Sequence, residues 1–207
     1  MPYVVLLRGV NVGGRRRVST VALAARLADL GVRSFGAAGT FVVRNGRSRD
    51  EVRAAFAGAL PFETEVVVRE ARELARLVAR RPFGPGAAPT DVVRFVTVLA
   101  TRPAADVTIP LERPTRGPWA LRLLARDGAY VVGEYRRVPE AIRVLATLDR
   151  LLGVSATTRT WSTIERVIAA LDVPPPSGAG APRSGRAPRG ASGPHPGRGR
   201  SDAPRTA

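Results

Sequence analysis

The residues best suited to chemistry lie near the N-terminus, in the segment LLRGVNVGGRRRV from Leu6 to Val18. It holds three glycines, one asparagine and four arginines. Glycine tolerates positive φ, so backbone N–H groups there can approach a ligand and form a concave site for an anion. The arginines add permanent charge in a geometry that suits phosphate or carboxylate. The segment therefore predicts a ligand-binding corner formed by Arg8, Gly9, Asn11, Gly13 and Gly14.

The spacing in this segment differs from the two best-known phosphate motifs. No GK[ST] follows the glycines, which excludes a Walker A loop, and the glycines do not have the G-x-G-x-x-G spacing. The alternative to an anion site is a glycine-rich connection whose arginines are only solvated. The residue types alone leave both interpretations open.

A second polar segment, Thr157 to Thr163, reads TTRTWST and stands where the last helix is expected to begin. Its hydroxyls can cap that helix, and Arg159 lies at the positive helix end. We predict that this segment and the glycine segment lie side by side and form one concave polar site, to which Thr158 and Arg159 contribute. The competing hypothesis is that Arg8 pairs with a carboxylate and that Asn11 only satisfies the backbone of its own turn.

Several kinds of chemistry are disfavoured by what the chain lacks. It has no cysteine, and its one histidine, His195, lies in the tail, so a thiol site, a histidine triad and a His-ligated metal are not expected in the folded body. No acidic pair has a recognisable metal or glycosidase spacing. We expect no metal and no cofactor, we name no catalytic residue, and we favour binding over catalysis.

Alternating apolar segments and amphipathic stretches predict a mixed α+β fold. The N-terminal order β-α-β-β-α-β is that of a ferredoxin-like unit. Expected strands are Tyr3–Leu7, Val32–Phe35, Gly39–Asn45, Thr64–Arg69, Val92–Ala100, Trp119–Leu124 and Tyr130–Val132. Expected helices follow Val21 and Ser48, contain Leu74 and Leu77, and run from Pro139 to Leu152 and from Trp161 to Leu171.

Composition divides the chain into three parts. Residues 1–80 are predicted to form the ferredoxin-like α+β unit, and residues 91–171 a smaller α+β unit that packs on the first and ends in two helices. The intervening residues 81–91 are rich in proline and glycine and read as a linker. Residues 172–207 hold Pro, Gly, Ala, Ser and Arg without an aromatic residue, which predicts a disordered tail.

The chain is strongly basic, with a net charge of +16, and all 33 of its cationic side chains are arginine. Abundant Ala, Gly and Pro accompany the arginine, as GC-rich coding would produce, so part of this charge reflects composition. Weak, non-specific nucleic-acid binding is still expected at low salt. No signal peptide or membrane-spanning run is recognisable, which predicts a cytoplasmic protein without membrane contact. The sequence does not indicate the oligomeric state.

Four segments, taken in order, resemble a family. They are the glycine segment, EVVVREARELARLVARRPF from Glu65, RFVTVLATRP from Arg94 and ATTRTWSTIERV from Ala156. Together they make residues 2–171 similar to bacterial proteins of the domain of unknown function 1697 family. The resemblance implies a compact α+β protein with a ferredoxin-like N-terminal part and no established activity.

The chain departs from that family's pattern at three polar positions. Ala37-Ala38-Gly39-Thr40 stands in place of QSGN, Ala141-Ile142 in place of a Ser-Lys pair, and Thr160-Trp161-Ser162-Thr163 in place of N-W-N-T. The lost Asn, Ser and Lys side chains weaken an enzyme interpretation further. Three hypotheses follow: a binding module for a phosphorylated or otherwise anionic ligand, an enzyme acting on such a ligand with unidentified catalytic groups, or a structural, protein-interaction domain.

Overall fold

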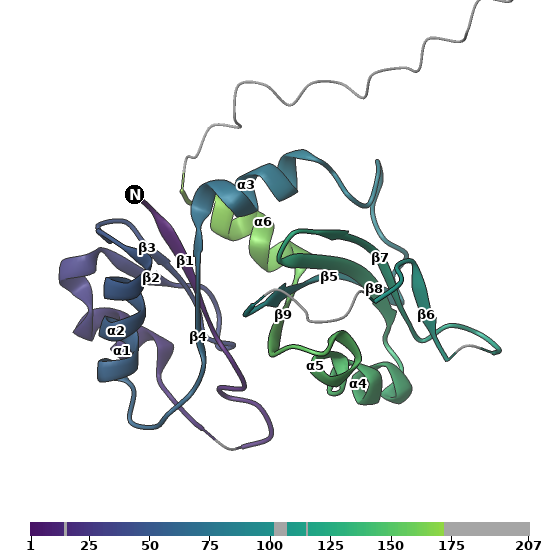
Figure 1. The fold of residues 1–207 in the computed structure, drawn as a ribbon, viewed down its shortest axis with the longest axis horizontal. Coiled ribbons are helices and arrows are strands. Elements are labelled where there is room, and N and C mark those ends of the chain that lie inside the picture. Colours follow the sequence, from purple (N-terminus) through teal and green to yellow (C-terminus); the bar gives the residue numbers. More distant parts are fainter. Residues whose placement is uncertain (15, 102–106, 115, 172–207) are drawn as a thin grey trace, which may run out of the picture.

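A computed structural model describes residues 1–14, 16–101, 107–114 and 116–171. This part of the chain forms two antiparallel sheets with six α-helices, so the mixed α+β prediction is confirmed. Figure 1 shows the sheets side by side, with the N-terminal half of the chain in purple and blue. The predicted tail, 172–207, lies outside the described residues.

The first sheet has the strand order β2-β3-β1-β4, and every neighbouring pair is antiparallel. Helices α1 and α2 pack on one face of it, where β1 and β3 contribute Val5 and Phe41 and α2 contributes Phe56 to a buried cluster. This arrangement is compatible with the predicted ferredoxin-like unit. Its elements are β1 (Tyr3–Leu7), α1 (Thr20–Arg26), β2 (Val32–Ser34), β3 (Thr40–Val43), α2 (Arg49–Ala59) and β4 (Val66–Glu70).

Local signals set two helix ends in this half. The Ser48 hydroxyl accepts the Glu51 backbone N–H at 3.1 Å and caps α2, as the S-x-x-E spacing predicts. The Glu51 carboxylate reaches the backbone N–H of Arg47 instead of the cap residue's own. Gly31 ends the short 3-10 helix Ala28–Leu30 in the left-handed conformation.

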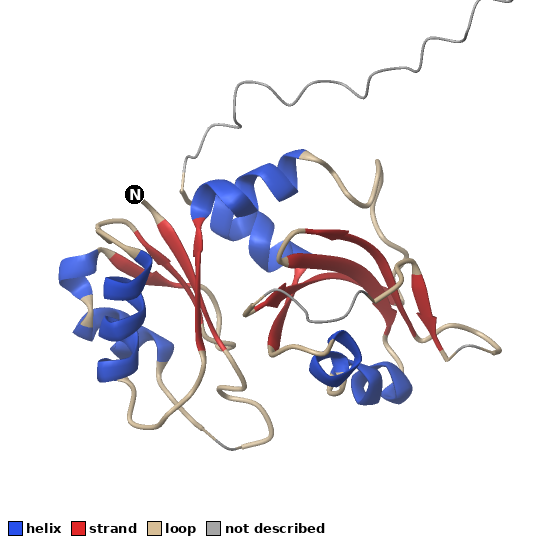
Figure 2. Cartoon of the chain, viewed as in Figure 1, coloured by secondary structure: helices blue, strands red, loops and turns tan. Residues whose placement is uncertain are grey.

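The second sheet has the strand order β6-β7-β8-β5-β9. Helices α4 and α5 lie below it in Figures 1 and 2, and Leu148 and Leu152 of α5 pack against Phe95 and Leu99 of β5. Its elements are β5 (Val92–Leu99), β6 (Leu111–Arg113), β7 (Leu121–Asp127), β8 (Tyr130–Arg136), α4 (Pro139–Leu145), α5 (Leu148–Leu152) and β9 (Ala156–Thr160).

A shared apolar core connects the two sheets. Helices α3 (Ala71–Ala79) and α6 (Trp161–Ala169) pack together, and their side chains join one buried cluster with residues of β1 and β5, including Leu6, Leu74, Val96 and Ile164. Burial of such side chains is worth about 1.5–3 kcal/mol each, so this core resists separation of the sheets. The predicted division at residues 1–80 and 91–171 stays a prediction.

The structure differs from the sequence-based expectations in the second half. The helix expected from Pro139 to Leu152 is two helices, because Thr147 leaves the helical conformation between α4 and α5. Strand β6 was not predicted. The segment expected to cap the last helix is strand β9, since its three threonines are β-branched and pair with β5. Helix α6 begins directly after it at Trp161.

No helix in the described ranges is both long and apolar enough to cross a membrane.

Candidate functional site

The loop between β1 and α1, residues 8–19, is here called the Asn11 loop. Five of its described residues have positive φ: Gly9 at 63°, Asn11 at 56°, Gly13 at 60°, Gly14 at 75° and Arg16 at 49°. Such angles cost glycine little, whereas a side chain at positive φ is uncommon and needs support from its surroundings. The three glycines thus have the positive φ that the sequence predicts, and Asn11 and Arg16 are the two described residues that need such support.

Asn11 provides that support. Its side-chain amide donates to the backbone oxygen of Val18 at 2.9 Å and to that of Ala37 at 2.7 Å, and its Oδ1 accepts the Val18 N–H at 2.9 Å. Its backbone N–H donates to the Arg16 oxygen at 3.2 Å. Asn11 thus closes the loop on itself and fixes it to the segment before β3, so its amide is engaged by the protein.

Arg8 follows β1 and forms an ion pair across the molecule. Its Nη2 lies 2.6 Å from Oδ2 of Asp149 on α5, and the two side chains are 40% and 30% exposed. One exposed ion pair of this kind contributes about 0.2–1 kcal/mol. A guanidinium has five N–H donors, so Arg8 keeps donors that this bond does not use. The part of the competing hypothesis that pairs Arg8 with a carboxylate is therefore confirmed, although the sequence did not identify Asp149 as the partner.

Arg159 is buried and points from β9 toward the first sheet. Its Nε donates to the Thr40 hydroxyl, its Nη1 to Thr157 Oγ1 and the Thr158 oxygen, and its Nη2 to backbone oxygens on the other sheet. The backbone oxygens that accept from Nη2 are those of Leu7 at 2.8 Å, Ala38 at 2.7 Å and Gly39 at 3.2 Å. Burial lowers the pKa of Arg159 to about 10. All five N–H groups are occupied, so Arg159 has none left for a ligand.

Thr158 lies on the opposite side of the strand from Arg159. In β9 it pairs with Thr97, and the two hydroxyls are 2.8 Å apart, whereas Arg159 pairs with Val96. Successive side chains of a strand point to opposite faces of the sheet. Thr158 and Arg159 therefore do not line one cavity. The expectation that both project from a helix N-terminus is wrong because the segment is a strand.

The two polar segments nevertheless meet at Ala37-Ala38-Gly39-Thr40. Asn11 binds the Ala37 oxygen, and Arg159 binds the oxygens of Ala38 and Gly39 together with the Thr40 hydroxyl. Most of these contacts are to backbone atoms. This explains how the segment can lose polar side chains and keep its place between the two sheets.

An open cavity of about 700 Å³, here called the loop groove, lies beside the Asn11 loop. Arg8 and Arg16 line one part, and Phe62, Glu63 and Glu65 line another. Its full lining is Arg8, Arg16, Ala57 and residues 60–65. A smaller cavity of about 430 Å³ lies against Asn11, Gly14, Arg17, Val18 and Ser19.

Arg16 is the distinctive side chain of the loop groove. Its Nη1 lies 3.8 Å from the point where a Cβ on Gly9 would stand, so its guanidinium lies over the start of the loop, near Arg8. Within the described ranges, Arg16 forms no ion pair with a carboxylate. Two cations thus share the groove, and only Arg8 has an anionic partner.

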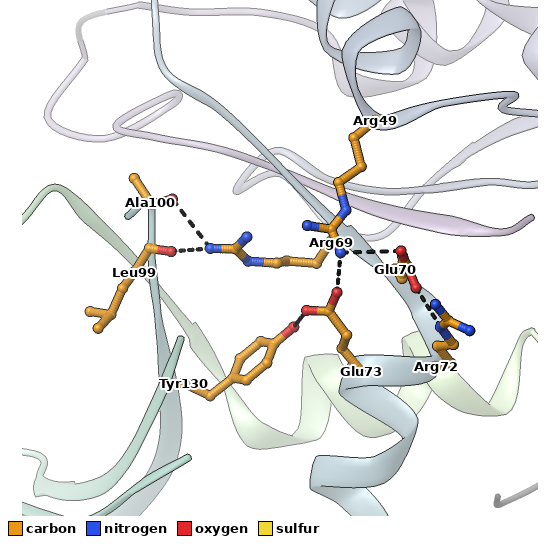
Figure 3. Close-up of polar contacts among 8 residues, drawn as sticks. All are labelled: Arg49, Arg69, Glu70, Arg72, Glu73, Leu99, Ala100 and Tyr130. Atoms are coloured by element: carbon orange, nitrogen blue, oxygen red, sulfur yellow. Dashed lines mark hydrogen bonds and ion pairs between the residues drawn. The ribbon is translucent and has the colours of Figure 1, made fainter. Parts of the chain in front are cut away.

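A second polar cluster lies away from the groove, between α3 and β8 (Figure 3). The Tyr130 hydroxyl donates to Glu73 at 2.9 Å, and Arg49 pairs with both Glu73 and Glu70. Burial, followed by the charge of Glu73, raises the pKa of Tyr130 well above its usual range. Burial would raise the pKa of Glu70, but Arg72 and Arg49 outweigh it and lower that pKa.

This cluster fastens α2, α3 and β8 together. Since the Glu73 carboxylate already binds an arginine and a tyrosine, both Glu73 and Tyr130 have a structural role here. Among the residues that the structure describes, no group of carboxylates or imidazoles is arranged to hold a metal ion.

The sequence profile of a family described as "Protein of unknown function (DUF1697)" matches residues 1–127. The chain belongs to the DUF1697 family. The match includes the Asn11 loop, the 37–40 segment and every residue of the loop groove. Comparison with curated proteins and with solved structures finds no match. The resemblance to the DUF1697 family over Ala156–Val167 lies beyond the matched residues and stays a prediction.

Sequence reasoning missed the 60–65 wall of the loop groove and the Arg8–Asp149 pair. The partners are 141 residues apart in sequence, and no local pattern connects them. The wall is an ordinary connection between α2 and β4, and it becomes part of a cavity only because β4 pairs with β1 beside the Asn11 loop.

Proposed function

We propose that this protein binds a small phosphorylated or otherwise anionic ligand in the loop groove. The observation that carries the proposal is that Arg8 and Arg16 line the same cavity, and that Arg16 forms no ion pair with a described carboxylate. Two arginines that line one cavity can bind the same anion together. Planar guanidinium groups suit phosphate and carboxylate oxygens.

The Asn11 loop supports this function by holding Arg16 in place. Arg16 is at φ 49°, and its backbone oxygen accepts the Asn11 N–H. A preorganised loop loses less conformational entropy on binding than a mobile one. The ligand-binding residues of the proposal are thus Arg8 and Arg16, with Gly9, Asn11, Gly13 and Gly14 shaping the loop.

The two residues from β9 have different roles in this proposal. Arg159 holds Leu7 and the 37–40 segment in position, and Thr158 belongs to the second sheet. Neither contacts the ligand. The rest of the groove favours a ligand that is not purely anionic, because the carboxylates Glu63 and Glu65 also line it beside the apolar Leu60 and Phe62.

A thermal-shift titration with inorganic phosphate and fructose 6-phosphate tests the proposal. A ligand that binds the native state raises the melting temperature. We expect Arg16→Ala to abolish the rise in melting temperature. Arg17→Ala should retain it, because Arg17 is the next residue of the same loop but lines the smaller cavity and not the loop groove. Equal losses in both variants would indicate general attraction to a basic protein and would overturn the proposal.

A further inference from the structure

A second cavity continues the loop groove along β4. It has a volume of about 400 Å³ and is here called the strand cavity. Ala57, Thr64 and Glu65 line both cavities, so the two adjoin at these residues. Beyond them the strand cavity runs along residues 66–69 and is bounded by Arg53, Arg69, Ala100 and Thr101.

Arg69 is an arginine without a carboxylate partner in the described part of the chain. Its Nη2 donates to the backbone oxygens of Leu99 and Ala100, and its buried Nε has no hydrogen-bond partner. Figure 3 shows the side chain reaching from β4 to these two carbonyl groups. Carbonyl dipoles do not cancel a full charge, so Arg69 retains a positive field beside the strand cavity.

Arg53 adds a second cation to this end. It projects from α2 and pairs with Asp50 one turn earlier, with the two side chains 50% and 90% exposed. An ion pair this exposed contributes little free energy, so Arg53 can leave Asp50 and bind an anion in the strand cavity. Each end of the combined cavity thus has one arginine with a carboxylate partner and one arginine that has none among the described residues.

The middle of the combined cavity has the opposite charge. Glu65 lies where the two cavities join, and one of its oxygens accepts the Ser155 hydroxyl. Its other oxygen accepts no hydrogen bond from a described residue. Glu63 lines the loop-groove side. Carboxylates at this position repel an anion and accept hydrogen bonds from hydroxyl or amino groups.

Building on the proposed function, we infer that the loop groove and the strand cavity together bind one small molecule with two anionic groups. One group binds Arg8 and Arg16, and the other binds Arg53 and Arg69. The segment that joins them is neutral or carries hydrogen-bond donors directed at Glu65. A continuous polyanion, such as polyphosphate, fits poorly because it would place negative charge against Glu65.

The test is isothermal titration calorimetry with linear bisphosphonates of about three to eight carbons, each compared with the monophosphonate of equal carbon number. Joining two groups that bind at once raises affinity when the linker matches the span, by 10²–10⁴ in favourable cases. We expect a gain of about tenfold or more at one optimal length, and weaker binding of tripolyphosphate than of that bisphosphonate.

Three variants identify the residues responsible. Arg53→Ala should remove the gain of the bisphosphonate and leave monophosphonate binding unchanged, whereas Arg16→Ala should weaken both. Arg47→Ala is the matched control, because Arg47 is also exposed, precedes the same helix and lines neither cavity. Arg69→Gln should likewise remove the gain of the bisphosphonate and leave monophosphonate binding unchanged. Its melting curve without ligand verifies that this variant folds.

The outcomes separate this inference from the proposed function. If monophosphonates bind and bisphosphonates bind no more tightly at any length, the two-ended ligand is wrong and the anion site at the Asn11 loop remains. A gain that survives Arg53→Ala, or that grows steadily with carbon number in both series, would also overturn it. If the wild-type protein binds neither kind of phosphonate, both proposals are wrong.

Discussion

Replacement of the buried Arg159 provides the sharpest test of how the two sheets are joined. Its five N–H groups reach six acceptors, of which the Leu7 oxygen and the hydroxyls of Thr40 and Thr157 belong to buried residues. In Arg159→Met the apolar stem is retained and every donor is lost. Each buried group left without a partner costs about 1–3 kcal/mol, which gives roughly 3–9 kcal/mol.

Part of this cost is offset because the variant no longer buries a charge. The pKa of Arg159 falls from 12.5 to about 10, and one pKa unit corresponds to about 1.4 kcal/mol, so burial of the cation costs about 3 kcal/mol. The net loss expected for Arg159→Met is therefore roughly 0–6 kcal/mol, with a central value of about 3 kcal/mol. Arg159→Lys should lose at least as much, because it keeps a buried charge and offers three donors instead of five.

Urea unfolding at neutral pH measures these free energies, with the exposed Arg166→Met on α6 as a control that should stay near wild type. Losses below about 0.5 kcal/mol in both Arg159 variants would refute the network, since surface substitutions have effects of that size. Wild-type stability in Arg159→Lys alone would show that positive charge, and not donor geometry, is what the site requires.

Three further predictions concern stability. Burial and the charge of Glu73 raise the pKa of Tyr130, so above pH 10 the unfolded state loses a proton that the folded state keeps. The free energy of unfolding should therefore fall by about 1.4 kcal/mol per pH unit above pH 10. Urea unfolding of Tyr130→Phe over the same pH range should not show this fall. Asn11→Ala should destabilise the fold by about 2–4 kcal/mol and abolish phosphate binding, because it removes three hydrogen bonds that fix the Asn11 loop. Unchanged phosphate binding in this variant would contradict the proposed role of the loop. Gly39→Ala should cost about 3 kcal/mol or more in thermal unfolding, because the added Cβ would lie 2.5 Å from a neighbouring atom and the residue has φ +71°. Gly13→Ala has open space around the added Cβ, so it should cost only the backbone strain of about 1–2 kcal/mol. Similar losses in the two variants would disprove the close packing at position 39.

The first half of the fold could be predicted from the sequence because its signals are local. The apolar segment at Tyr3–Leu7 and the cap at Ser48 each act within a few residues, and the structure confirms both. The glycines of the Asn11 loop likewise predict positive φ where it is found.

The second half shows where local signals fail. Residues 156–160 carry three threonines, which serve equally well as helix caps or as strand residues, and pairing with β5 decides between them. That pairing joins residues about sixty positions apart and has no local pattern. The same holds for Arg159, whose predicted role in a ligand site depended on exposure that the fold removes.

Site prediction was limited for the same reason. Asn11 and Arg159 both bind the 37–40 segment, but residue type does not reveal which donors the protein itself occupies. Asn11 and Arg159 are engaged by backbone oxygens, whereas Arg16, which was noted only as one of several loop arginines, forms no ion pair with a described carboxylate. Only the contacts of the folded chain separate a bracing side chain from one available to a ligand.

The central claim, an anion site at the Asn11 loop, is tested most directly by an amide proton–nitrogen NMR titration with inorganic phosphate. The account predicts saturable shifts concentrated at Arg8, Gly9, Arg16 and residues 62–65, which disappear in Arg16→Ala and persist in Arg17→Ala. Shifts that do not saturate, or that spread evenly over exposed arginines such as Arg47 and Arg166, would contradict it, because they are the signature of a basic surface without a site.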